Sequence, residues 1–288
     1  MSKTNKIILI SCIVLFIFAS FYYSIMYLPA KINVTSFDYK SSNYPSNYPI
    51  LRIVAISDIY AGSYHIDEKK LEEIVKHINL LNPDIVLLLG NYINSWSVLG
   101  NHINPNRISD IFANIKSSYG TYAVFGKNDS FRGEKAIISA FNRNNIKALD
   151  NEITTVNIGQ KKVLNIIGID SFSDEKFNQD FINNNEDIKN NPYIIISNNP
   201  KNILSLDTNI IKNASFSLSG MTLGGQIKMP WLKNKDIKKS IKNAYGFYKI
   251  EENSDIYITS GIGTKTYPIR IGSSPEILFI NLYSSNLD

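Results

Sequence analysis

The sequence predicts an α/β fold in which helices cover a largely parallel sheet. Three short runs rich in branched apolar residues read as buried strands, at residues 51–56, 84–89 and 121–125. Each run is followed by a segment with apolar residues at helical spacing, at residues 67–81, 108–115 and 133–144. Strands that alternate with helices in this way are typical of parallel sheets.

The individual elements rest on local signals. The run 51–56 is apolar apart from Arg52 and lies between Pro49 and the polar residue Ser57. The helix predicted over 67–81 has one apolar face, formed by Leu71, Ile74, Val75, Ile78 and Leu81. The helix predicted over 133–144 has another, formed by Ala136, Ile137, Ala140 and Phe141.

The second half of the soluble part is richer in strands. Apolar or alternating runs predict them at residues 152–158, 161–168, 193–197, 215–219, 255–259 and 276–282. No internal repeat is evident, and no Pro/Gly-rich linker divides residues 51–288. We therefore expect these residues to form one domain.

Composition excludes several classes of protein. Of 288 residues, 44% are apolar and 19% charged, which excludes a disordered or collagenous chain. The single cysteine, Cys12, excludes a disulfide framework and a Cys-rich zinc module. The net charge of +5 is small, and we expect no nucleic-acid partner.

The N-terminal segment predicts a single-pass membrane protein. After a short tail of residues 1–6, residues 7–30 carry no charge, and a helix of about 22 residues is long enough to cross a bilayer core. Tyr22, Tyr23 and Tyr27 suit an interface, where amphipathic rings gather. Residues 31–50 lack a sustained apolar period, and we expect them to be a tether between anchor and domain.

Two other interpretations of this segment stay open. A signal peptide with a cleavage site near Ala19-Ser20 is one, and a lipoprotein signal ending at Cys12 is the other. The orientation depends on a nearly balanced comparison of Lys3 and Lys6 with the lysines after the segment. The short basic N-terminus favours a cytoplasmic start, which places the domain on the extracytoplasmic side of the cell membrane.

Polar loops follow the predicted strands. In open α/β sheets, chemistry gathers in the loops beyond the carboxyl ends of the strands. These loops are Asp58-Ile59-Tyr60, Gly90-Asn91-Tyr92, Gly126-Lys127-Asn128-Asp129, Ser197-Asn198-Asn199-Pro200, and residues 219–226 with Met221 and Leu223.

The order and spacing of these five motifs resemble those of the calcineurin-like metallophosphoesterases, in particular their membrane-associated bacterial branch. The resemblance covers residues 51–288 and includes Tyr119-Gly120-Thr121 and Gly224-Gly225-Gln226 beside the motifs. It implies a sandwich of two mixed β-sheets flanked by helices. It also implies two divalent metal ions that polarise a phosphoryl group and generate a hydroxide nucleophile.

The positions that would carry this chemistry are mostly replaced. Asp58 matches the first metal ligand, and Asp129 matches an orienting neighbour that does not bind metal. The remaining positions are degenerate equivalents: Tyr60, Asn198, Met221 and Leu223 for ligand histidines, Asn91 for the bridging Asp, Lys127 for a ligand Asn, and Asn128 for the His that protonates the leaving group.

These replacements argue against a two-metal site. Two divalent ions about 3.5–4 Å apart need anionic ligands to offset their mutual repulsion. Among the ligand positions, Asp58 is the one that still carries a carboxylate, and a single carboxylate is not enough. Leu223 has no lone pair, and the thioether of Met221 is too soft for phosphoester hydrolysis. We expect no cofactor. The alternative is a single Mg²⁺, Mn²⁺ or Ca²⁺ on oxygens of Asp58, Asn91, Asn128 and Asp129.

Other residues offer weaker candidates. His65 and His77 are expected to be solvated, and His102, in Gly100-Asn101-His102, is expected not to correspond to the family's Gly-Asn-His motif. Lys127 has two interpretations. It either pairs with Asp58 or Asp129 as an internal cation, or it is a solvated surface lysine.

Two functions follow. The first is a membrane-anchored pseudoenzyme that binds a phospholipid, a nucleotide-linked lipid or a protein partner without hydrolysis. The second is an active phosphodiester or pyrophosphate hydrolase with an atypical site, on a lipid-linked substrate such as the UDP-diacylglucosamine of some active relatives. The retained glycine turns, beside lost coordinating side chains, favour the first.

Overall fold

The computed structural model describes residues 2–94, 99–132, 134–172, 179–228, 241 and 244–286. The chain starts with α1 (Lys3–Tyr22) and continues into a π-helical segment, η1 (Tyr23–Tyr27). Within the described residues, this is the one helix long and apolar enough to cross a membrane. It begins four residues before the predicted segment 7–30 and ends three residues earlier. Leu28 and Pro29 are buried against the domain.

The prediction of a tether over residues 31–50 is wrong. Residues Asn33–Ser41 form a strand, β1, which pairs in parallel with β12 (Glu276–Ser284) over nine registered positions. Its side chains alternate between half-buried and exposed. The inward positions before Ser41 include Phe37 and Tyr39 but also Asn33 and Thr35, so the sequence shows no apolar period.

The first sheet has the strand order β1-β12-β2-β3-β4-β5 in the described chain. Its central strands are β2 (Leu51–Ile56), β3 (Ile85–Leu88), β4 (Thr121–Ala123) and β5 (Ile146–Ala148), all parallel, while β12 runs antiparallel to β2. The prediction missed β5, which has only three residues.

The second sheet has the order β10-β11-β9-β8-β7-β6 in the same residues. Its members are β6 (Glu152–Asn157), β7 (Val163–Ile169), β8 (Tyr193–Ser197), β9 (Phe216–Ser219), β10 (Gly246–Glu251) and β11 (Ser254–Ile258). The strands β7, β8, β9 and β11 are parallel, and antiparallel β6 and β10 close the edges. Both sheets are mixed, and the predicted fold class is confirmed.

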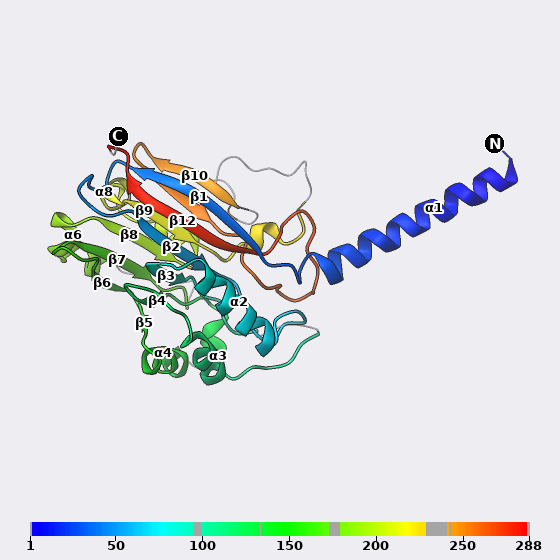
Figure 1. Cartoon of the computed structure of the whole chain (residues 1–288), viewed down its shortest axis with the longest axis horizontal. Coiled ribbons are helices and arrows are strands. Elements are labelled where there is room, and N and C mark those ends of the chain that lie inside the picture. Colours follow the sequence, from blue (N-terminus) through cyan, green and yellow to red (C-terminus); the bar gives the residue numbers. More distant parts are fainter. Residues whose placement is uncertain are drawn as a thin grey trace.

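Helices cover the outer face of each sheet (Figure 1). The first sheet is covered by α2 (Glu68–Leu80), α3 (Pro105–Phe112) and α4 (Glu134–Arg143). The short helices α5 (Asp180–Asn183), α6 (Asp187–Asn190), α7 (Pro200–Leu204) and α8 (Thr208–Asn213) lie with the second sheet. Asn104 caps α3 and Pro105 starts it, which explains why this helix precedes the predicted range 108–115.

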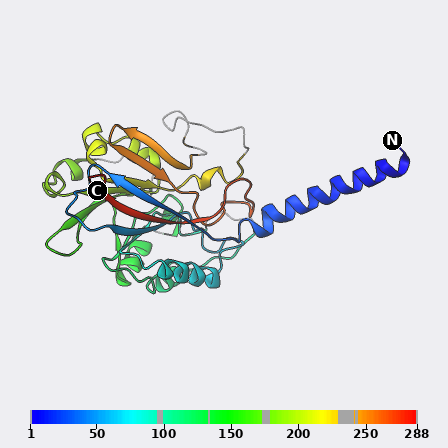
Figure 2. The same ribbon diagram turned by 45° about the horizontal axis from the view of Figure 1, so that its top comes forward.

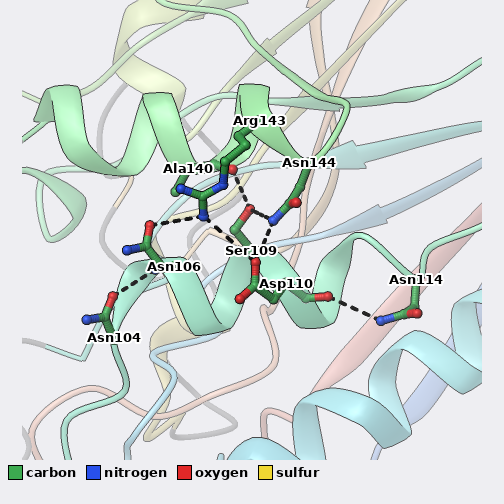
Figure 3. A network of polar contacts seen from close by, with 8 residues as sticks. All are labelled: Asn104, Asn106, Ser109, Asp110, Asn114, Ala140, Arg143 and Asn144. Carbon is green, nitrogen blue, oxygen red and sulfur yellow. Dashed lines mark hydrogen bonds and ion pairs between the residues drawn. The ribbon is translucent and has the colours of Figure 1, made fainter.

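A polar network fastens α4 to α3 (Figure 3). The Ser109 hydroxyl donates to the carbonyl of Ala140 at 2.7 Å and accepts from Nδ2 of Asn144 at 2.9 Å. Nδ2 of Asn144 also donates to the Asp110 carboxylate at 2.9 Å. These contacts fix the two helices that cover β4 and the loop after it.

Alternation along β2 divides the core. Leu51, Ile53 and Ala55 face the second sheet in the cluster between the sheets, whereas Val54 and Ile56 face the helices. Because both faces are buried, the strand reads as a continuous apolar run. The site loops start where this run ends.

Candidate functional site

The predicted loops meet at the carboxyl ends of the parallel strands. Asp58 follows β2, Asn91 follows β3, and Asn198 follows β8 directly. Asp58, Asn91, Met221 and Leu223 all have positive φ angles, between 50° and 73°. Left-handed backbone costs a non-glycine residue of the order of 1 kcal/mol. The loops at these strand ends therefore keep a backbone shape that is costly for residues other than glycine.

The centre of the site is a cluster of carboxamides. Nδ2 of Asn91 donates to Oδ1 of Asp58 at 2.8 Å and to Oδ1 of Asn198 at 3.0 Å. Oδ1 of Asn91 accepts from Nδ2 of Asn128 at 2.8 Å. Nδ2 of Asn198 donates to the carbonyl of Leu89 at 2.7 Å. The structure therefore brings together the predicted positions 58, 91, 128 and 198, and they bond to one another.

The Asp58 carboxylate has no accessible surface and a full set of donors. Besides Asn91, the hydroxyl of Ser57 donates to Oδ2 at 2.9 Å and the backbone N–H of Met221 donates to Oδ2 at 2.7 Å. Burial raises the pKa of Asp58, and hydrogen bonds from Asn91 and Ser57 lower it in part. The contact with Met221 ties the β2 loop to the loop after β9.

Asp129 organises the loops through the backbone. Its buried carboxylate accepts from the N–H groups of Asn91 and Tyr92 at 2.7 Å, of Gly126 at 2.9 Å and of Ile93 at 3.2 Å. Burial raises the pKa of Asp129 to about 7, although these backbone hydrogen bonds lower it. Asp129 thus clamps the loop after β3 to the loop after β4.

The other predicted positions differ in accessibility. Tyr60 and Leu223 are buried, Met221 and Asn128 are half-buried, and Lys127 is exposed. Burial and the charge of Asp58 raise the pKa of Tyr60 well above its ordinary value. The carboxylates of Asp58 and Asp129 take the contacts described above from amides and a hydroxyl, whereas the side chain of Lys127 is exposed.

The histidines fall elsewhere. His102 is exposed in another loop and lines a cavity of about 600 Å³ together with Gly62, Tyr64 and Leu99. His77 is partly exposed, with Nε2 3.7 Å from Glu73. The expectation of a solvated His65 is wrong, because this half-buried ring places Nε2 2.6 Å from the carbonyl oxygen of Ile25, at the end of the N-terminal helix.

Sequence reasoning missed Arg270, which is completely buried beside the site. Its guanidinium donates to the carbonyls of Ser260, Gly261 and Gly263 at 2.6–3.1 Å. Burial lowers the pKa of Arg270 to about 10, while the charges of Asp58 and Glu276 raise it. The one signal in the sequence was a charged residue between the apolar residues Ile269 and Ile271.

The donor set does not fit a pair of divalent ions. The oxygens of Asp58 that would face a metal already accept N–H and O–H groups. A Cβ at Gly126 would come within 2.4 Å of the side-chain oxygen of Asn91 and 2.6 Å of that of Asn198, so this part of the site is close-packed. Among the described residues, no group of three or more His, Cys, Asp or Glu side chains is arranged to hold a metal.

Two stacked mixed sheets, with helices outside them and polar loops at the carboxyl ends of their parallel strands, define an α/β sandwich. The chain belongs to the calcineurin-like phosphoesterase family, whose model matches residues 51–241. The predicted family is confirmed.

Similar proteins include bacterial and animal members. The uncharacterised metallophosphoesterase Cj0846 of Campylobacter jejuni is 25% identical over 81% of this chain and 59% of its own length. YkoQ of Bacillus subtilis, also an uncharacterised metallophosphoesterase, is 26% identical over 86% of this chain and 89% of its own length. A "transmembrane protein with metallophosphoesterase domain" of Danio rerio is 27% identical over 83% of this chain and 54% of its own.

The chain spans about six-tenths of the length of the relatives from Campylobacter jejuni and Helicobacter pylori. Among solved structures, a putative 5'-nucleotidase of Staphylococcus aureus superposes with a TM-score of 0.48 and 8% identity over 83% of this chain and 55% of its own.

Proposed function

We propose that this protein is a membrane-anchored, catalytically inactive phosphoesterase-family member that acts by binding. The observation that carries the proposal is the Asn91 carboxamide, which donates to both Asp58 and Asn198. An N–H group in this place presents a partial positive charge to the oxygens that would otherwise face a cation. A neutral amide cannot offset the repulsion of two divalent ions.

The charge of the site supports the same proposal. In a family whose members normally use divalent metals, positive charge offsets the carboxylates. Here, the buried cation beside Asp58 is Arg270, which is held by backbone carbonyls. A buried charge with well-placed partners is tolerated, whereas an unpaired one is costly. The guanidinium of Arg270 therefore supplies positive charge to the site from within the chain.

Membrane anchoring by α1 and η1 completes the proposal. The length and composition of this helical segment suit a bilayer core. Two similar proteins, from Danio rerio and Bos taurus, are named as transmembrane proteins with a metallophosphoesterase domain. Lys3 and Lys6, at the N-terminal end of α1, favour an extracytoplasmic domain. The partner that we propose is a phospholipid or nucleotide-linked lipid, with no role for nucleic acid.

The test is metal content together with hydrolysis. The full-length chain, purified in detergent and incubated with Mn²⁺, is analysed for bound metal and then assayed with bis-p-nitrophenyl phosphate. We expect less than one equivalent of metal and no turnover. Two equivalents with turnover would overturn the proposal. Release of UMP from UDP-diacylglucosamine would instead support the active hydrolase with an atypical site.

A further inference from the structure

The end of the N-terminal helix is docked on the domain without an intervening tether. The carbonyl of Ser24 accepts the backbone N–H of Arg270 at 3.0 Å, and the carbonyl of Ile25 accepts Nε2–H of His65 at 2.6 Å. Leu28, which follows η1 directly, is buried. Two loops and an adjoining buried residue hold the end of this helix, so they fix which end of the domain lies next to it.

Large apolar side chains surround this docking point. Five of them leave between 36% and 60% of their surface exposed, and we call them the apolar rim: Tyr64, Leu99, Ile227, Tyr267 and Ile271. Scattered apolar residues on a surface need no explanation, whereas a group gathered around one feature does.

Backbone contacts join the rim to the helix end. Ile227 and Ile271 form a bridge, and Nε2 of Gln226 donates to the carbonyl of Tyr267 at 3.0 Å. Ile271 follows Arg270, which contacts Ser24. On the other side, Tyr64 precedes His65, and a bridge between Ser63 and Gly100 places Leu99 beside them.

The two views show the same arrangement. The helix α1 leaves the sandwich at the end where η3 (Leu223–Gly225) and the loop between β11 and β12 lie (Figure 1). The turned view keeps these segments together (Figure 2). The helix α8 lies at the opposite end of the sandwich.

We infer that the apolar rim is a second membrane contact, seated in the interface of the bilayer that α1 crosses. This inference rests on the anchoring role proposed for α1. The occupant follows from continuity: Tyr23 and Tyr27 stack at the helix end with ring centroids 5.4 Å apart, as in an aromatic belt, and the rim continues that belt onto the domain. Lys31 and Lys265, both exposed nearby, suit anionic head groups.

Contact between the apolar rim and the bilayer would determine whether a ligand reaches the domain from the membrane or from bulk water. Leu223 accepts hydrogen bonds from Ser273 at 2.7 Å and from Arg270, so the loop after β9 belongs to the same end of the domain as the rim. This end of the domain, with the loop that ties Met221 to Asp58, therefore faces the bilayer. A ligand for it would be a lipid that reaches the site from the membrane surface and not a solute from bulk water.

The test reads membrane depth at single cysteines in the full-length chain. Cys12 in α1 is labelled with the fluorophore NBD, and in a Cys12→Ser background the label is placed at Tyr267→Cys, Ile227→Cys or Asn209→Cys. Asn209 is exposed on α8 and serves as the matched control. Each variant is reconstituted into phosphatidylcholine–phosphatidylglycerol vesicles with nitroxide-labelled lipid.

We expect quenching at Cys12, and quenching at positions 227 and 267 at least about twofold stronger than at 209. Strong quenching at Cys12 with positions 227 and 267 no different from 209 would overturn the inference and leave the anchor standing. Absence of quenching at Cys12 would overturn the anchor and the inference together.

Discussion

Nδ2 of Asn91 lies 2.8 Å from Oδ1 of Asp58, so an amide donates a hydrogen bond to the carboxylate that the sequence predicts to be a retained metal-ligand position. Both side chains are buried. Carboxylates at both positions would suit a cation shared between them. Here, the N–H of the Asn91 amide occupies the place beside the Asp58 carboxylate that such a cation would take.

Asn91→Asp is expected to make the protein respond to metal. Two buried carboxylates at this separation repel each other, and one must stay protonated or accept a cation. In EDTA, we expect a loss of about 2–4 kcal/mol in the free energy of unfolding. Mn²⁺ should raise the midpoint of thermal unfolding of this variant and leave that of the wild type unchanged.

Differential scanning calorimetry with and without Mn²⁺ measures both effects. Asn199→Asp is the matched control, because residue 199 caps α7 and Asp caps a helix as well as Asn does. An equal response to Mn²⁺ in the wild type would contradict the amide-filled site.

Arg270→Met is expected to destabilise the protein by about 3 kcal/mol or more, since it leaves buried carbonyls of Ser260 and Gly263 without a donor. Lys127→Ala is expected to change the free energy of unfolding by less than about 0.5 kcal/mol, because Lys127 is exposed. Urea unfolding in detergent compares the two. The reverse order would reinstate Lys127 as the internal cation of the site.

The raised pKa of Asp129 predicts a stability that falls with pH. The carboxyl ionises near pH 3.9 when unfolded and at about 7 when folded. Between these values, the folded state keeps a proton that the unfolded state has lost. The free energy of unfolding therefore decreases as pH rises from about 4 to about 7, by up to about 1.4 kcal/mol per unit, and levels off above.

Urea unfolding of the wild type and of Asp129→Asn, measured from about pH 4 to about pH 7, isolates the contribution of Asp129. The free energy of unfolding of Asp129→Asn should change less with pH than that of the wild type. The raised pKa of Asp58 acts with the same sign in both proteins. Asp67→Asn, at the exposed cap of α2, is the control. Parallel profiles for the wild type and Asp129→Asn would contradict the titration.

Phe37→Ala tests β1 as part of the core. The Phe37 ring contacts Phe247 at 4.6 Å and Tyr257 at 5.1 Å between centroids. We expect a loss of about 2–4 kcal/mol in the free energy of unfolding, as for other truncated core aromatics. Lys40→Ala, on the outward face of the same strand, should cost less than about 0.5 kcal/mol. Equal effects in urea unfolding would restore the interpretation of a tether.

Much of the fold could be predicted because its signals are local. The buried run of β2 and the apolar face of α2 each lie within one short stretch, and burial on both faces makes a strand apolar throughout. Strand β1 escaped prediction because its inward residues are partly polar and its partner, β12, lies more than two hundred residues away.

The site divides in the same way. The sequence by itself determined which side chains the strand-end loops carry. From these the resemblance predicts that Asp58 stands without the ligand histidines and the bridging carboxylate. Only the tertiary structure decided what those residues bond to instead. The amide of Asn91, the carboxylate of Asp129 and the guanidinium of Arg270 find their partners across loops distant in sequence. Hydrogen bonds require distance and direction, and these exist only once the sheets bring the strand ends together.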